Sequence, residues 1–233
     1  MSLMLREGKV CEQVLAILEK DGVVKRGHFV GFSRKHLNLF VDFEEMFENP
    51  AYAEDLKVIL EYLAQGIVQA GLDPHVLIGP AEGGNKLAQR LAPMLEPLLG
   101  HRVQAVLTVK NGENFIIQAD ESQLKDRLTL VLDDVMTSGK SCLGVAVPAR
   151  WLGAQIIGIV VVVDRERKTA EALGVPFYGF LAEVETKSWN VPEGEACDPC
   201  DHGVPFSPVN SHTREHIAKH GQPVPRIGID LMT

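Results

Sequence analysis

The stretch from Leu128 to Ser141, LTLVLDDVMTSGKS, contains side chains suited to binding a sugar and a phosphate. An apolar run leads into Asp133 and Asp134, and residues 137–141 then offer three hydroxyl groups. Adjacent carboxylates suit a ribose diol, because they can accept hydrogen bonds from its hydroxyl groups, or a divalent metal bound through water. Hydroxyls and backbone N–H groups in a turn that opens a helix suit a phosphate monoester. A helix capped after an acidic turn would explain one hydroxyl residue, but not two acids and three hydroxyls together.

The letters GKS in this stretch do not indicate a nucleoside triphosphate loop. A Walker P-loop requires the spacing G-x-x-x-x-G-K-[ST], which is missing here. The stretch therefore predicts a site for a ribose phosphate.

A second glycine-rich turn, LIGPAEGG, lies at Leu77–Gly84. Its glycines allow backbone N–H groups to approach a ligand closely, and the N-terminus of the following helix adds a positive dipole end. This arrangement suits a diphosphate. A tight strand-to-helix turn also favours glycine, so a purely structural role remains open for this segment.

Short strands rich in Val, Ile and Leu alternate with helical segments along most of the chain. The strands are expected at 75–79, 102–109, 128–132, 155–164 and 176–184. Helices are expected at 10–22, 49–71, 80–100 (with a break at Pro93 or Pro97), 138–154 and 167–175, and a hairpin or flexible loop at 110–126. This alternation predicts an α/β fold with a parallel sheet covered on both faces and right-handed connections. Both glycine-containing turns follow strands, at the edge of such a sheet where ligands bind.

Composition limits the class of protein. The chain has 233 residues, a net charge of −8 and 45% hydrophobic residues, so it can form a core and does not suit broad nucleic-acid binding. It has no apolar run long enough to span a membrane. Its four cysteines do not suggest a disulfide framework. We expect a cytoplasmic protein.

The segment V-L-D-D-V-M-T-S-G resembles the phosphoribosyl diphosphate (PRPP) motif of type I phosphoribosyltransferases. The resemblance implies that family's parallel-sheet fold over residues 1–190, with a small N-terminal hood at about 1–45 and a C-terminal extension at 191–233. It also implies that the two acids hold the ribose hydroxyls and that Mg²⁺ arrives with PRPP. The 5′-phosphate would then lie on Val135, Met136, Thr137, Ser138, Gly139, Lys140 and Ser141, and the diphosphate on Pro80, Ala81, Glu82, Gly83 and Gly84.

Two further segments resemble orotate phosphoribosyltransferases. GHFVGFSRKHLNLFVD matches their N-terminal segment at Ser33, Lys35 and His36, and VVVDRE places Arg165 where they carry an arginine. The resemblance implies that Lys35 reaches the diphosphate and that Arg165 pairs with the orotate carboxylate, which a planar guanidinium can bind in a fork. Without the resemblance, a solvated charge after a strand is the favoured reading of Arg165. Lys110 matches the family's lysine at the end of the third core strand.

The resemblance thus implies a homodimeric enzyme that transfers a phosphoribosyl group from PRPP to orotate, giving orotidine 5′-monophosphate and diphosphate. Catalysis would depend on positioning and electrostatics. The following loop, residues 111–125, is acidic where relatives are basic. Departing diphosphate requires positive charge. A transferase for another, purine-like base and a PRPP-binding regulator without turnover therefore remain alternatives.

The C-terminal segment contains the pattern CDPCDHGVP, which is similar to the end of some bacterial orotate enzymes. Cys197, Cys200 and His202 are candidates for three ligands of a zinc site. A fourth ligand is not evident from spacing, although three histidines would share one face of a helix over 211–220: His212, His216 and His220.

Overall fold

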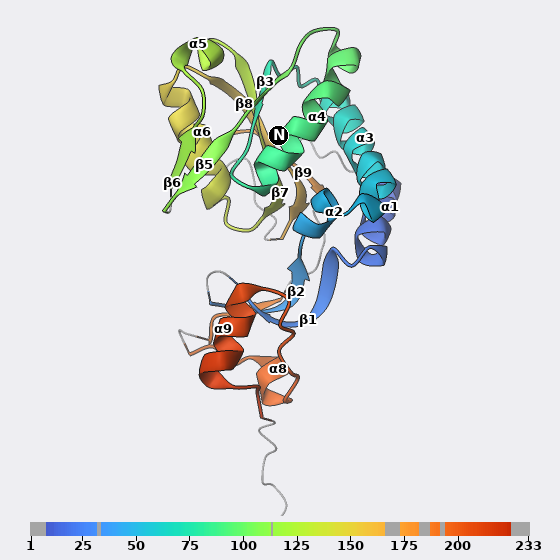
Figure 1. The fold of residues 1–233 in the computed structure, drawn as a ribbon, viewed down its shortest axis with the longest axis vertical. Coiled ribbons are helices and arrows are strands. Elements are labelled where there is room, and N and C mark those ends of the chain that lie inside the picture. Colours follow the sequence, from blue (N-terminus) through green and yellow to red (C-terminus); the bar gives the residue numbers. More distant parts are fainter. Residues whose placement is uncertain are drawn as a thin grey trace, which may run out of the picture. The chain divides into compact units, whose positions relative to one another are not determined.

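The computed structural model describes residues 8–31, 34–112, 114–165, 173–181, 187–191 and 194–224. These residues form two compact units (Figure 1). The larger unit holds the described residues up to 21 and those from 43 to 181, and the smaller unit holds 22–42 and those from 187 onward. This division differs from the sequence-based one at residue 190, because the hood strands fold with the C-terminal segment and the first helix folds with the larger unit.

The larger unit is built on a five-stranded parallel sheet, as the alternating pattern predicts. The strand order is β4-β3-β7-β8-β9, and each neighbouring pair is parallel. The strands are β3 (Val76–Ile78), β4 (Gln104–Val106), β7 (Leu128–Met136), β8 (Gln155–Asp164) and β9 (Phe177–Leu181). Their central residues are buried and mostly branched aliphatic, as expected for a sheet covered on both faces.

Helices cover this sheet. They are α1 (Gly8–Lys20), α2 (Glu44–Glu48), the 3₁₀ turn η1 (Pro50–Tyr52), α3 (Ala53–Gln69), α4 (Gly83–Leu99), α5 (Glu121–Leu124) and α6 (Lys140–Trp151). α3 and α4 lie side by side, and α6 lies beyond the strands from them (Figure 1). One apolar cluster joins Cys142, Val145 and Ala149 of α6 to Val131 of β7 and Ile159 of β8. No helix among the described residues is long and apolar enough to cross a membrane.

The order of the strands creates a switch point between β3 and β7. The chain runs from β3 through α4 to β4 on one side of β3, and then returns to β7 on its other side. At such a point the loops after the two central strands diverge and leave a crevice at their carboxyl ends. The two turns singled out from the sequence follow β3 and β7, so both lie at this switch point.

Three sequence-based boundaries differ from the structure. α4 is continuous through Pro93 and Pro97. Both prolines are exposed, so water can reach the carbonyl groups that lose their helical partners. β7 extends to Met136, so the two acids lie inside the strand and not after it. The strand expected at 102–109 is divided at Leu107 into β4 and β5 (Thr108–Asn111), which pairs with β6 (Asn114–Ile117) in a separate hairpin.

Most of the helix expected at 167–175 lies outside the described residues.

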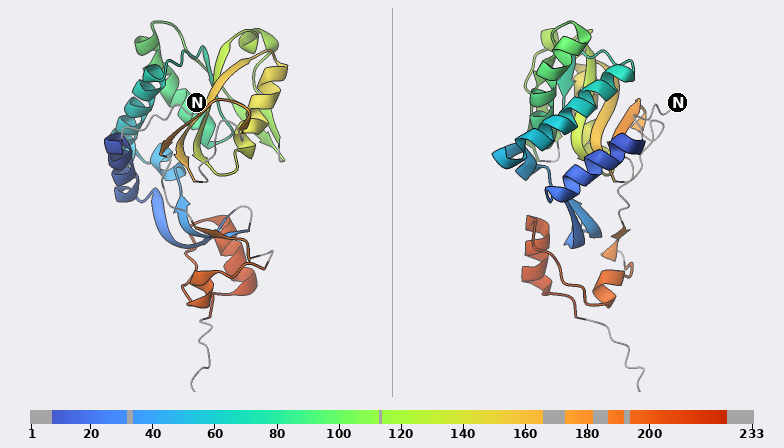
Figure 2. Two further views of the ribbon diagram at one scale, coloured as in Figure 1. Left: turned by 180° about the vertical axis from the view of Figure 1, so that it is seen from behind. Right: turned by 90° about the vertical axis from the view of Figure 1, so that its right-hand side faces the viewer.

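The smaller unit joins the N-terminal hairpin to the C-terminal segment. β1 (Val24–Val30), β2 (His36–Val41) and β10 (Ser188–Trp189) form an antiparallel sheet in the order β1-β2-β10. α8 (Asp198–Asp201) and α9 (Ser211–His220) complete the unit, and Figure 2 shows these C-terminal elements, in orange and red, beside the hairpin in blue. The C-terminal segment is therefore a structural part of the hairpin's fold.

Thr213 anchors α9 to the free edge of β1. Its side chain is fully buried, and its hydroxyl accepts a hydrogen bond from the Val30 N–H at 2.9 Å and donates one to the Val30 carbonyl at 3.3 Å. Asn210 caps the helix by accepting from the Thr213 N–H. A single hydroxyl thus satisfies both backbone groups of a strand residue that has no ladder partner on this side.

Replacing Thr213 by Val should therefore leave the Val30 N–H and C=O buried and unsatisfied. We expect the smaller unit to lose about 1–3 kcal/mol of stability. Amide hydrogen exchange in α9 and β1 measures this loss. Thr213→Ser keeps the hydroxyl and is the matched control. Equal exchange rates in the two variants would show that the hydroxyl does not anchor the helix.

Candidate functional site

The two turns meet at the switch point in direct contact. A Cβ added to Gly83 would collide with the Asp134 carboxylate. One added to Gly84 would lie 2.7 Å from the Leu132 carbonyl oxygen, and one added to Gly79 would collide with the same oxygen. The glycines of 79–84 are therefore needed for close packing of this loop against the end of β7. This packing role does not conflict with the ligand-binding role that the sequence suggests for the same loop.

Asn85 and Thr108 fix the loop from its other side. The Thr108 hydroxyl donates to the Gly79 carbonyl at 2.8 Å. The Asn85 side chain donates to the Thr108 carbonyl at 2.7 Å and accepts from the Thr108 N–H at 2.9 Å. Sequence reasoning missed both residues, because no local pattern links positions 23 residues apart. Their location directly beyond the glycine loop and strand β4 is the only signal the sequence offered.

The two adjacent acids point to opposite faces of the sheet, because side chains alternate along a strand. Asp133 points toward α6, where the Cys142 thiol lies 3.5 Å from its Oδ2. Asp134 points toward the glycine loop, beside Gly83. Asp133 is almost completely buried, whereas Asp134 is partly exposed. Asp134 is therefore the acid that a ligand on the loop can reach directly.

Asp133 holds the backbone of Asp134 through a hydrogen bond. Its Oδ1 accepts a hydrogen bond from the Asp134 N–H at 3.1 Å, and Asp134 Oδ1 accepts from the Val135 N–H at 2.8 Å. Burial raises the pKa of the Asp133 carboxyl well above its ordinary value, and repulsion from Asp134 raises it further. Burial also raises the pKa of the Cys142 thiol, next to Asp133. The site thus keeps a buried acid that favours its protonated form.

The turn after β7 is open to solvent. Thr137, Ser138, Lys140 and Ser141 are exposed, and α6 begins at Lys140. Gly139 takes a left-handed conformation, with φ of 76°, which glycine adopts without strain. The exposed hydroxyls and the first N–H groups of this 12-residue helix are available to an anion. Val135 and Met136 belong to the strand and contribute backbone at its end.

Arg165 lies at the same edge of the sheet. It directly follows β8, and its backbone N–H donates to the Met136 carbonyl at 2.9 Å. Met136 is in register with Asp164, a buried residue at the end of β8. Arg165 is therefore attached to the residue that precedes the hydroxyl turn.

Lys110 lies on the β5–β6 hairpin, exposed and in register with Phe115. The acids that follow it have structural partners. Asp120 caps α5, with a capping box to Gln123, and Glu121 pairs with Lys125 at 2.8 Å. The acidity of this segment therefore reflects a capped helix and an i,i+4 ion pair.

Lys35 is in the smaller unit, where its carbonyl accepts from the Gly31 N–H at 2.9 Å. Ser33 lies outside the described residues.

Cys197 and Cys200 do converge, but with two histidines other than those considered from the sequence. They lie with His28 and His36, and His202 is highly exposed and hydrogen-bonded to the Asp198 carbonyl. His28 was missed because it lies 169 residues before Cys197, and motif spacing does not indicate contacts between residues so far apart. The occurrence of both histidines within the segment GHFVGFSRKHLNLFVD was the available signal.

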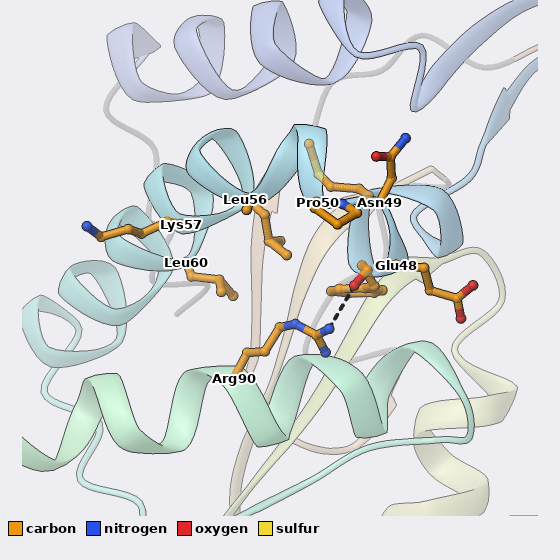
Figure 3. Close-up of a pocket in the computed structure, with 10 residues that line it drawn as sticks. Glu48, Asn49, Pro50, Leu56, Lys57, Leu60 and Arg90 are labelled. Carbon is orange, nitrogen blue, oxygen red and sulfur yellow. Dashed lines mark hydrogen bonds between the residues drawn. The ribbon is translucent and has the colours of Figure 1, made fainter.

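A hollow on the larger unit lies apart from the two turns. Figure 3 shows it between α2, η1, α3 and α4, with Leu56 and Leu60 on one wall and Arg90 on another. The Arg90 guanidinium donates to the Phe47 carbonyl at 2.8 Å and lies over the Phe47 ring. Since its one guanidinium is held by the protein itself, this hollow suggests no chemistry.

Comparison with known proteins gives a consistent result. The family model for the phosphoribosyl transferase domain matches residues 45–196. An orotate phosphoribosyltransferase of Caldanaerobacter subterraneus subsp. tengcongensis is 33% identical over 197 residues, which cover 84% of this chain and 94% of that protein. One from Heliobacterium modesticaldum is 30% identical over 205 residues, covering 87% of this chain and 98% of that protein.

Solved structures extend the comparison to the fold. The orotate phosphoribosyltransferase of Francisella tularensis matches with a TM-score of 0.56 and 23% identity, covering 72% of this chain and 84% of that one. The adenine phosphoribosyltransferase of Saccharomyces cerevisiae matches with a TM-score of 0.53 and 18% identity, covering 72% and 99%. At these identities the matches establish the fold alone.

The buried Asp133 generates a pH-dependent prediction. Because the pKa of Asp133 is raised in the folded state, its ionisation opposes folding, and its contribution to the free energy of unfolding falls as pH rises from about 4, the pKa of an unfolded aspartate. Asp133→Asn removes this ionisation. We expect the variant to be more stable than wild type at pH 7–8, with the difference vanishing below about pH 4.

Urea unfolding at several pH values measures the difference. Glu61→Gln, an exposed acid-to-amide change on α3, is the control and should show no such trend. A difference independent of pH would contradict a destabilising ionised Asp133.

Proposed function

Because the chain belongs to the phosphoribosyltransferase family, we propose that it is an orotate phosphoribosyltransferase, which transfers the 5-phosphoribosyl group of PRPP to orotate and releases diphosphate. The observation that carries the proposal is the contact between the glycine loop and Asp134 at the switch point. That contact brings a diphosphate cradle, a sugar-binding acid and a phosphate turn to one edge of the sheet.

Each part of PRPP has a complementary group there. The 5′-phosphate lies on the turn 137–141, where exposed hydroxyls and the N–H groups at the N-terminus of α6 can donate hydrogen bonds to an anion. Asp134 accepts hydrogen bonds from the ribose hydroxyls, and Asp133 fixes the backbone N–H of Asp134. The diphosphate lies on the loop 80–84, at the N-terminus of α4.

The residues present also fit the Mg²⁺ that accompanies PRPP. A hard cation prefers oxygen ligands and retains several waters, and the partly exposed Asp134 carboxylate beside the glycine loop is such a ligand. When bound, Mg²⁺ neutralises charge on the diphosphate. Lys110 and Lys35 provide further positive charge in this proposal. The chain's own contribution is positioning of the sugar and stabilisation of the leaving group.

The choice of orotate follows from sequence. The curated relatives from Caldanaerobacter and Thermoanaerobacter, 33% and 32% identical over most of the chain, are orotate enzymes. The fold does not distinguish bases, since an adenine enzyme matches it nearly as well as an orotate enzyme. Arg165 supports orotate specifically, because a guanidinium at this edge pairs with a carboxylate, which adenine and hypoxanthine lack. We also expect a cytoplasmic homodimer that acts in pyrimidine synthesis.

Turnover tests the proposal directly. The protein mixed with PRPP, Mg²⁺ and orotate should consume orotate, followed by its absorbance. Lys110→Ala should lower turnover by about 10²-fold, the usual effect of losing a group that stabilises a transition state. Lys125→Ala, which removes a lysine paired with Glu121, is the matched control and should keep full turnover.

Consumption of adenine or hypoxanthine instead of orotate would indicate the second candidate, a purine-type transferase. PRPP binding without any turnover would indicate a regulator.

Arg165→Lys tests the choice of base. Lysine keeps the charge but cannot form the forked pair with a carboxylate. We expect the KM for orotate to rise about 10- to 100-fold, with little change in the KM for PRPP. Steady-state kinetics with each substrate varied in turn measures both. Arg150→Lys, at the exposed end of α6, is the control. An equal rise in both constants would refute a carboxylate contact.

A further inference from the structure

Four potential metal ligands converge inside the smaller unit. His28 comes from β1, His36 from β2, and Cys197 and Cys200 from the turn that forms α8. One ligand atom from each lies within 4.8 Å of all the others. His28, His36 and Cys197 are buried, and Cys200 is partly buried. All four cysteines lie in the described part of the chain, and none of them forms a disulfide there.

The separations of these atoms match the edges of a small tetrahedron. A tetrahedral ion with bonds of about 2.3 Å to sulfur and about 2.05 Å to nitrogen separates nitrogen from sulfur by about 3.6 Å and two nitrogens by about 3.3 Å. The His28 Nε2 lies 3.5 Å from Cys197 Sγ and 3.7 Å from Cys200 Sγ. The His36 Nδ1 lies 3.2 Å from Cys200 Sγ and 3.2 Å from His28 Nε2.

The hairpin directs both imidazoles to the same place. Val30 pairs with His36 across the sheet, and His28 lies two residues before Val30, so His28 and His36 share one face. The His28 Nδ1 lies 2.9 Å from the Val204 carbonyl and therefore carries the proton that it donates there. The His28 Nε2 is then unprotonated, and its lone pair points toward the other three ligand atoms. Metal-bound histidines typically have such a second hydrogen bond.

The turn that carries the cysteines is arranged to match. The backbone N–H of Cys200 donates a hydrogen bond to the Cys197 sulfur. The Gly203 N–H donates to the Cys200 carbonyl and closes the turn. Phe206 stacks on His28 at 4.0 Å between ring centroids and contacts the edge of His36. An aromatic wall therefore shields the ligand groups from water.

The ligand atoms of the cluster converge on one point. The His28 Nε2 faces three polar atoms, which are His36 Nδ1, Cys197 Sγ and Cys200 Sγ. One cation at the centre would contact all four ligand atoms at once.

We propose that His28, His36, Cys197 and Cys200 bind one Zn²⁺ that fastens the C-terminal segment to the β1–β2 hairpin. Two thiolates and two imidazoles in a closed tetrahedron are the ligand set of structural zinc. The smaller unit has short strands and two short helices, and a unit with so small a core commonly needs a metal or a disulfide. The site is structural and separate from phosphoribosyl transfer.

Metal analysis of the full-length protein tests this proposal. After chelation, incubation with Zn²⁺ and removal of excess metal, wild type should retain about one Zn²⁺ per chain. Reconstitution with Co²⁺ should give thiolate charge-transfer bands and the intense visible bands of a tetrahedral site. Cys200→Ser and His28→Gln should each lower retained zinc at least tenfold. His202→Ala and Cys11→Ser are the matched controls and should retain wild-type zinc, since neither residue belongs to the cluster.

Three results would overturn the proposal. In the first, the wild-type protein loses its zinc when excess metal is removed. In the second, the Co²⁺-loaded protein shows no thiolate charge-transfer bands. In the third, His202→Ala loses as much zinc as Cys200→Ser. If a ligand variant does not fold, the wild-type Co²⁺ spectrum decides the question alone. Because every readout is metal content or spectrum, the result does not depend on whether orotate reacts.

Discussion

The close contact between the glycine loop and the end of β7 is the constraint on which the larger unit depends. The loop approaches within van der Waals range of the Leu132 carbonyl and the Asp134 carboxylate, which only residues without a side chain allow. Thr108 and Asn85 hold the loop from the β4 side. The proposed diphosphate cradle and the proposed sugar-binding acid are thereby fixed to one edge of the sheet, as catalysis by positioning requires.

This arrangement has an energetic cost that the proposed function explains. A buried carboxyl next to a second carboxylate is unfavourable when ionised, and the Asp133 side chain contacts the Asp134 N–H and the Cys142 thiol. Functional sites commonly retain such local conflicts while the rest of the fold is consistent. The apolar cluster that joins α6 to β7 and β8 supports the strand that carries both acids.

Local patterns in the sequence were sufficient for the fold class, the parallel strands and the positions of the two turns after β3 and β7, because each depends on neighbouring residues. They were not sufficient where the answer depends on distant contacts. The alternation that sends Asp133 and Asp134 to opposite faces required knowing that β7 continues to Met136. The continuity of α4 required knowing that Pro93 and Pro97 face solvent. The contact of His28 with Cys197 joins opposite ends of the chain, and no periodicity encodes it. His36, which contacts Cys200 and His28, directly follows Lys35, the residue proposed to reach PRPP.

The central claim is that the glycine loop and Asp134 form one binding site for PRPP. Calorimetric titration of Mg²⁺ and PRPP into wild type and Gly83→Ala tests it most directly, because the added methyl group collides with the Asp134 carboxylate. The account predicts that wild type binds and that the folded variant binds at least tenfold more weakly. Equal affinity in the two proteins would contradict it.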